Sequence, residues 1–82
     1  MKTTFYFVQA EFYSYGKQAA FVGDMCAEAQ PRGYRRDVYG MTAFKLWFSS
    51  EIAAQALVDV INKGTASADD VAYALTGKRA AA

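Results

Sequence analysis

The 82-residue chain contains no histidine, one cysteine and one proline. Without histidine there is no imidazole metal ligand and no histidine-based acid–base or triad chemistry. Cys26 alone forms neither an intramolecular disulfide nor a cysteine-based zinc site. A lone thiol suits a reducing compartment, so we expect a cytoplasmic protein. These absences remove common classes of enzyme and metal-binding protein.

Long hydrophobic runs are also missing. The apolar stretches, such as residues 19–22, are far shorter than the roughly 18–20 residues of a membrane span. The glycines stand singly at expected turns, so no glycine-rich phosphate loop is present. The adjacent carboxylates Asp69 and Asp70 open a predicted helix, where the helix dipole explains them better than a metal does. We therefore predict a protein that is not an enzyme, with no cofactor, no metal and no membrane partner.

Hydrophobic residues make up 54% of the chain and charged residues 21%, which is typical of a folded domain. The net charge of +1 argues against both an acidic DNA mimic and a strongly basic DNA coat. The length suits one domain. We assign that domain to residues 1–79, and we interpret residues 80–82 as a disordered tail or a remnant of cloning. Aromatic side chains are abundant, with six Phe, six Tyr and one Trp.

Two segments have the alternation of β-strands. Residues 3–13 are rich in aromatic and β-branched side chains, and Gln9 and Glu11 are awkward to bury, so the even positions should face the core. Residues 37–48 alternate in the same way, and Gly40 marks a turn or bulge, so this segment is one strand or a hairpin. The side chains expected on the core face are Tyr6, Val8, Ala10, Phe12, Val38, Thr42, Phe44, Leu46 and Phe48.

The segment 17–30 fits two structures. As a helix it places Phe21, Val22, Met25 and Ala29 on one stripe, and Pro31 would end it. As a strand it would form a hairpin that turns at residues 15–17. The alanines favour the helix by propensity, so we predict a helix here.

Two further helices are expected near the C-terminus. Ser49 or Ser50 caps the first, which Gly64 ends. Ser67 and Asp70 resemble a capping box at the start of the second, which Gly77 closes. The predicted fold class is α+β: a small antiparallel sheet of two or three strands with helices packed on one face, in the order β-α-β(β)-α-α. The side chains expected on the buried sides of these helices are Ile52, Ala53, Ala56, Leu57, Val60, Ile61, Val71, Ala74 and Leu75.

Helices on one face leave aromatic side chains on the other, unless loops or the first helix cover them. That face is expected to carry Phe5, Phe7, Tyr13, Tyr39, Met41 and Trp47. Exposed Tyr, Trp and Met beside Arg have the composition of a protein interface. We predict that a partner contacts the exposed aromatics and the basic segment after Pro31, through Tyr13, Tyr15, Arg32, Tyr34, Arg35, Arg36, Tyr39 and Trp47.

A small RNA- or single-stranded-DNA-binding domain is the alternative, because strand aromatics beside arginines can stack bases. Residues 32–34 match the start of the RNP1 pattern. Arg35, Arg36 and Asp37 then occupy the positions that should carry a small residue, an aromatic and a valine. The chain also ends in predicted helices where an RNA-recognition module needs a fourth strand. Homodimerisation through the aromatic face is a third alternative.

In its size, its compact α+β pattern, its lack of catalytic residues and its aromatic surface, the chain resembles the small single-domain proteins that phages encode to inhibit host systems, including anti-CRISPR proteins. The resemblance implies a stoichiometric inhibitor that acts in the host cytoplasm. Such an inhibitor binds a host protein complex and blocks its nucleic-acid site or its assembly. A host protein is therefore the favoured partner.

Overall fold

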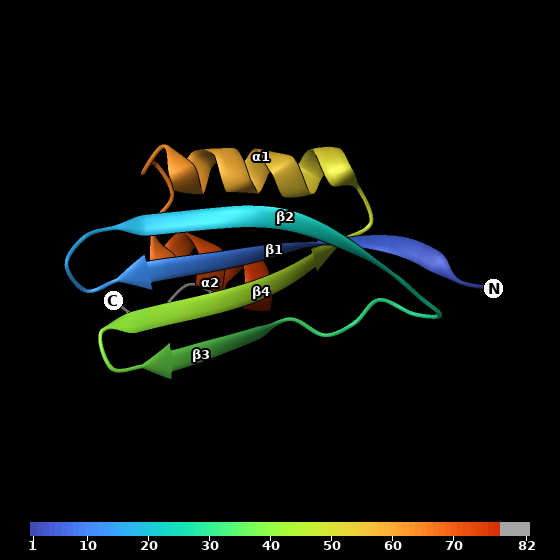
Figure 1. Ribbon diagram of the computed structural model, residues 1–82, viewed down its shortest axis with the longest axis horizontal. Helices are drawn as coiled ribbons and strands as arrows, with labels where there is room; N and C mark the ends of the chain where they lie inside the picture. Colours follow the sequence, from blue (N-terminus) through green and yellow to red (C-terminus); the bar gives the residue numbers. More distant parts are fainter. Residues whose placement is uncertain (78–82) are drawn as a thin grey trace.

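The computed structural model describes residues 1–77 and contains a four-stranded antiparallel sheet followed by two helices. The elements are β1 (Thr3–Tyr13), β2 (Gln18–Ala27), β3 (Tyr34–Val38), β4 (Met41–Phe48), α1 (Glu51–Asn62) and α2 (Ala68–Thr76). The strand order is β2-β1-β4-β3, so β1 and β4 are central (Figure 1). Helix α1 runs along β2 and packs on β2 and β1, whereas α2 packs on β4. The α+β class is confirmed. The chain order is β-β-β-β-α-α, and residues 80–82 lie outside the described part.

The helix predicted over residues 17–30 is wrong, because this segment forms β2 and pairs with β1. The pairing runs without a bulge from Thr3 opposite Ala27 to Phe12 opposite Gln18. In the connecting turn, the Gly16 N–H donates to the Tyr13 carbonyl at 3.0 Å. Pairing along almost the whole of β1 therefore outweighs the local helix propensity of the alanines.

The segment 37–48 belongs to a second hairpin, formed by β3 and β4. Val38 pairs with Met41, and the turn between them contains Gly40 at φ 79°, a conformation that glycine adopts readily. Tyr39 lies at the tip of this turn, fully exposed, and not within a strand as expected. Val38 shares the face of Met41 because the two residues are paired. Its predicted place in the core is therefore wrong.

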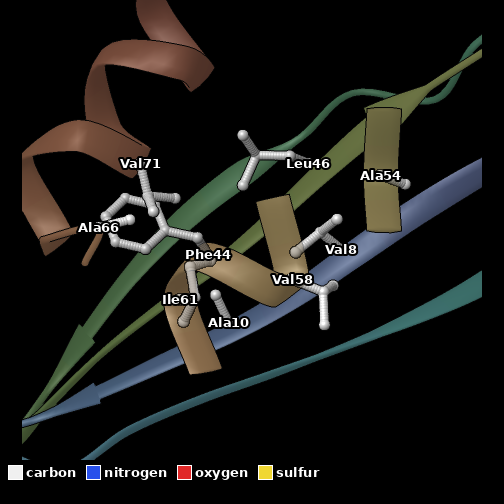
Figure 2. Packing of buried hydrophobic residues seen from close by; sticks show 9 residues of the cluster. All are labelled: Val8, Ala10, Phe44, Leu46, Ala54, Val58, Ile61, Ala66 and Val71. Carbon is white, nitrogen blue, oxygen red and sulfur yellow. The ribbon is translucent and has the colours of Figure 1, made fainter. Parts of the chain in front are cut away.

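The core lies between the sheet and the two helices (Figure 2). Phe44 is fully buried there, and its ring meets that of Phe12 edge-on with centroids 5.9 Å apart. The predicted burial of Phe44 and Leu46 is confirmed, and Phe48 is half-buried. The buried cluster consists of Val8, Ala10, Phe44, Leu46, Ala54, Val58, Ile61, Ala66 and Val71.

The rotation of α1 differs from the prediction. Ile52 is 84% exposed, and Ala53, Ala56 and Val60 are also exposed, whereas Ala54 and Val58 face the sheet. On α2, Ala74 is exposed rather than inward.

The end of α1 is fixed by side chains at the sheet edge. The Asn62 amide accepts from the Ala20 N–H at 2.8 Å and donates to the Ala20 carbonyl at 3.1 Å. Gln18 donates to the carbonyls of Ile61 and Ala66 at 2.9 and 2.7 Å. These four bonds hold the last turn of α1 and the loop that follows it against β2, and they fix the side of the helix that faces the sheet.

The helix ends follow the capping pattern of the sequence. Ser50 caps α1, and Ser67 and Asp70 form a complete capping box on α2. Gly64 follows α1 with a positive φ, and Gly77 is the C-cap of α2, as predicted. Within residues 1–77, neither helix is long and apolar enough to cross a membrane.

We expect Phe44→Ala to lower the free energy of unfolding by about 3–5 kcal/mol, because the substitution leaves a cavity in the centre of the core. Ile52→Ala is the control, with an expected change within about 0.5 kcal/mol, since this side chain lies in solvent. Urea denaturation of the two variants measures both values. Equal losses would contradict the assignment of inside and outside.

Candidate interaction surface

The face of the sheet opposite the helices is called the open face here. Side chains alternate along a strand, and Tyr6, Val8, Ala10 and Phe12 of β1 point to the helices, so its odd positions point away. The strand register extends this division to the other three strands. The larger side chains on the open face are Phe5, Phe7, Gln9, Glu11, Tyr13, Phe21, Met25, Tyr34, Arg36, Val38, Met41, Lys45 and Trp47.

Phe7, Phe21, Trp47 and Lys45 form what we call the aromatic cluster. The Phe7 ring centroid lies 5.3 Å from that of Trp47 and 6.3 Å from that of Phe21, which it meets edge-on. The Lys45 ammonium lies 4.4 Å from the Phe7 centroid and 5.2 Å from the Trp47 centroid. A cation over an aromatic ring contributes about 0.5–1 kcal/mol at an exposed site. The cluster thus joins β2, β1 and β4 across the open face.

Gly23 provides the space in which the Phe7 ring lies. The two residues are directly opposite each other in β2 and β1, and a β-carbon at position 23 would collide with the ring. An aromatic side chain over a glycine of the neighbouring strand compensates for the missing side chain there. One side of the Phe7 ring is therefore covered by the backbone of β2.

The open face becomes more polar toward the β1–β2 turn. Tyr13 donates its hydroxyl hydrogen to Glu11 at 2.9 Å and stacks on Tyr15, with ring centroids 5.4 Å apart. The hydrogen bond to Glu11, followed by partial burial and the negative charge of that carboxylate, raises the pKa of the Tyr13 phenol. Arg36 of β3 lies opposite Ala43 on the same face.

The predicted site residues do not form a single patch. Tyr13, Tyr34, Arg36 and Trp47 share the open face, and Tyr15 joins them by stacking on Tyr13. The remaining three lie elsewhere: Arg32 in the connection 28–33, Arg35 on the helix side of β3 and Tyr39 at the turn tip.

The three arginines of the basic segment do not lie together, because neighbouring residues of a strand point to opposite faces. Arg35 lies over the Phe44 ring, 5.5 Å from its centroid, and its Nε donates to Asp37 at 3.0 Å. Arg36 points to the open face, and Arg32 is exposed beyond the strand. No common surface is therefore formed by the three side chains.

The open-face residues that were not among the predicted site residues include Phe7, Phe21, Met25 and Lys45. Phe21 and Met25 were assigned to a helix, although both lie at odd positions of a segment that also alternates as a strand. Phe7 was expected on this face but was not assigned to the site, and the structure places both Phe7 and Lys45 beside Trp47.

Asp37, on the helix side of β3, accepts hydrogen bonds from two neighbouring side chains that stabilise its charged form. The Thr42 hydroxyl donates to it at 2.8 Å, and Arg35 donates from the same strand. The Thr42 bond first, and the Arg35 bond and charge after it, lower the pKa of Asp37. Asp37 also lines a hollow of about 380 Å³ with Phe12 and Met41. Within residues 1–77, no three Cys, Asp or Glu side chains gather as metal ligands.

The chain matches no protein-family model, no curated protein and no solved structure.

Gly23→Ala should destabilise the protein by about 1–3 kcal/mol, because the added methyl group displaces the Phe7 ring. In a Phe7→Ala background the ring is gone, and the same change should be neutral or stabilising, since alanine restricts the unfolded chain more than glycine does. Thermal or urea unfolding of the four proteins measures this coupling. An equal cost in both backgrounds would show that the ring does not pack on Gly23.

Thr42→Val should raise the pKa of Asp37 toward its ordinary value by removing the largest cause of its depression. A depressed carboxyl pKa stabilises the fold at pH values above the unfolded-state pKa, and this stabilisation is lost as the pH falls through the folded-state pKa. In the variant, Asp37 should therefore contribute less to the decrease in the free energy of unfolding at acidic pH. An NMR titration of the Asp37 carboxyl measures the shift. Arg35→Gln is the comparison, and a larger effect from Arg35→Gln would reverse the order of causes.

Proposed function

We propose that this chain is a non-enzymatic protein-binding domain and that the open face is its docking surface. The observation that carries the proposal is the aromatic cluster, which lies on the side of the sheet away from both helices. Phe21 is 57% exposed, and Met25 and Tyr34 on the same face of the sheet are 44% and 43% exposed. Aromatic and methionine side chains are enriched at the centre of protein interfaces. Arg36 and Lys45 add the charged groups that interface rims carry.

The size of the open face is compatible with this role. Four strands about 4.8 Å apart, from about 17 Å long for the five residues of β3 to about 36 Å for the eleven of β1, give roughly 500 Å² in projection. The accessible area is larger than this projection, because side chains stand above the sheet and the turns at Tyr15 and Tyr39 are exposed. A standard interface buries about 800 Å² on each partner. A docking protein that covered the sheet and one turn would reach this range.

The contacts within the cluster favour a protein over a single-stranded nucleic acid. Base stacking needs free ring faces. The Lys45 ammonium lies over both Phe7 and Trp47, and Gly23 lies against Phe7. The three arginines diverge, so they form no continuous track for a phosphate backbone. These features support protein docking, with nucleic-acid binding as the competing outcome of the test.

The inhibitory role implied by the phage-protein resemblance is part of this proposal. A stoichiometric inhibitor needs only a surface that occupies its target's site, and it requires no reactive group. The aromatic cluster, with polar groups beside it, meets this requirement. Under this proposal the chain binds a host protein complex through the open face and excludes that complex's nucleic acid or its next subunit.

Trp47→Ala should weaken partner binding by about 2 kcal/mol or more, roughly 30-fold, because Trp47 contributes a large rigid contact area. Melting should change little by comparison with Phe44→Ala. Wild-type protein, Trp47→Ala and the α1 control Ile52→Ala are each immobilised on a resin and incubated with host lysate. The captured proteins are quantified, and each is then titrated against the three proteins to measure its affinity. Capture that depends on Trp47 but not on Ile52 supports the proposal.

Equal capture by Trp47→Ala and wild type would contradict the open face as the docking surface. A labelled oligo-dT strand, titrated at low salt, tests the alternative. Oligo-dT binding that Trp47→Ala abolishes would replace the protein partner with a single-stranded nucleic acid. Such binding should weaken with salt, by about 0.7 in log–log slope for each phosphate contact.

A further inference from the structure

We propose that the free edge of β2 accepts an extended strand of a partner protein, in which basic residues alternate with apolar ones. This adds a fifth strand to the sheet, at a place separate from the centre of the aromatic cluster. It is independent of the open-face proposal, because strand addition uses main-chain groups and not the Trp47 side chain.

The orientation of the β2 backbone is fixed by two sets of hydrogen bonds. The N–H and carbonyl of Ala20 both bond to Asn62, so they point away from β1. At the turn, the Tyr13 N–H donates to the Lys17 carbonyl at 2.8 Å, so Lys17 points toward β1. In an antiparallel strand the two directions alternate. Odd positions of β2 therefore bond to β1, and even positions point outward.

Three further residues of β2 share the outward direction of Ala20, because the register has no bulge: Val22, Asp24 and Cys26. At Ala20 the Asn62 amide takes the place of a strand neighbour, offering one donor and one acceptor. Within residues 1–77 no hydrogen bond reaches the outward main-chain groups of the other three residues. The stretch from Val22 to Cys26 thus offers three N–H groups and three carbonyls over about 13 Å.

The side chains beside this edge differ in character between the two faces. On the open face, Phe21 and Met25 are exposed apolar groups at 57% and 44%. On the helix side, Asp24 of β2 and Glu51 at the start of α1 line a hollow of about 220 Å³. Within residues 1–77 neither carboxylate has an ion-pair partner.

Helix α1 carries a further acidic side chain, Asp59. Asp59 lies three positions before Asn62, the residue that reaches the β2 edge, and it accepts a hydrogen bond from Gln55 at 2.9 Å. An incoming strand would place alternate side chains beside Phe21 and Met25. The intervening side chains would point toward Asp24 and Glu51, where lysine or arginine complements the charge. The pattern that fits is apolar–basic alternation.

The other sheet edge lacks these features. β3 has only five residues, and its outward positions are Arg35 and Asp37, which are charged and bonded to each other. Short, charged edges resist strand addition. β2 has ten residues, and Asp24 is its one charged residue. The acceptor role is therefore assigned to β2.

Charge also argues against a second copy of this chain as the occupant. A symmetric antiparallel pair of β2 strands that used all three outward residues would be centred on Asp24. The two Asp24 carboxylates would then lie opposite each other, and like charges directly opposite are destabilising. The partner that fits is a different chain with basic residues.

The test uses a blocked octapeptide of alternating valine and lysine as the probe, with amide hydrogen exchange of ¹⁵N-labelled protein as the readout. In the free protein, the Ala20 amide should exchange slowly, whereas those of Val22, Asp24 and Cys26 should exchange fast. Millimolar peptide should slow these three by at least tenfold. Asp24→Asn should weaken the effect severalfold, while Trp47→Ala should leave it unchanged.

Two control peptides separate main-chain pairing from charge. A peptide with glutamate in place of lysine should give no protection, because it faces Asp24 and Glu51. A valine–lysine peptide N-methylated at every residue should also give none, since neither of its edges can donate to the β2 carbonyls. This control requires no protein variant that could fail to fold.

Several results would overturn the inference. No protection with the valine–lysine peptide would exclude the acceptor edge, and equal protection by the glutamate peptide would exclude the basic partner. Protection of Val22, Asp24 and Cys26 in concentrated peptide-free protein, with a dimer in sedimentation, would make a second copy the occupant. None of these outcomes depends on whether Trp47 docks a partner on the open face.

Discussion

The pairing of β1 with β2 along one side and β4 along the other determines which side chains are inside and which are outside. Because β1 is central and regular, its even positions enter the core and its odd positions the open face. Phe44 and Leu46 are buried because they lie opposite Ala10 and Val8. Trp47 is on the open face because it lies opposite Phe7. Core and aromatic cluster are therefore two results of one register.

The two short helices can cover only one side of such a sheet. Ser50 and the Ser67–Asp70 box define where they begin, and the bonds of Gln18 and Asn62 fix how α1 lies on β2. The aromatic side chains on the other side pack on one another and on Gly23 instead. This arrangement leaves two kinds of accessible surface, an aromatic face and an edge of free main-chain groups.

The sequence was informative wherever the deciding interactions were local. Gln9 and Glu11 gave the correct inward face of β1, and the serine caps gave the starts of both helices. The segment 17–30 was misassigned because Phe21, Val22 and Met25 fit a helical stripe as well as a strand, and the choice depends on β1, which is distant in sequence. The rotation of α1 depends likewise on Gln18 and Asn62, which meet only in the folded chain.

The candidate site was predictable to a similar extent. Strand alternation placed Trp47 and Tyr13 on the open face, but Arg32 and Arg35 were grouped with Arg36 only because they are close in sequence. The position of Lys45 over two rings needed the register of β4 against β1. The phage-type inhibitory role and the choice of a host protein as the partner stay predictions.

The central place of β1 also orders events during synthesis of the chain. The β1–β2 hairpin is complete once Ala27 has emerged, but the other side of β1 waits for β4, which ends at Phe48, about twenty residues farther along. An isolated hairpin is marginally stable in water. Until β4 arrives, the aromatic residues of β1 and β2 have no core to join, so this nascent hairpin is the stage at which the chain is most exposed to aggregation or to chaperone capture.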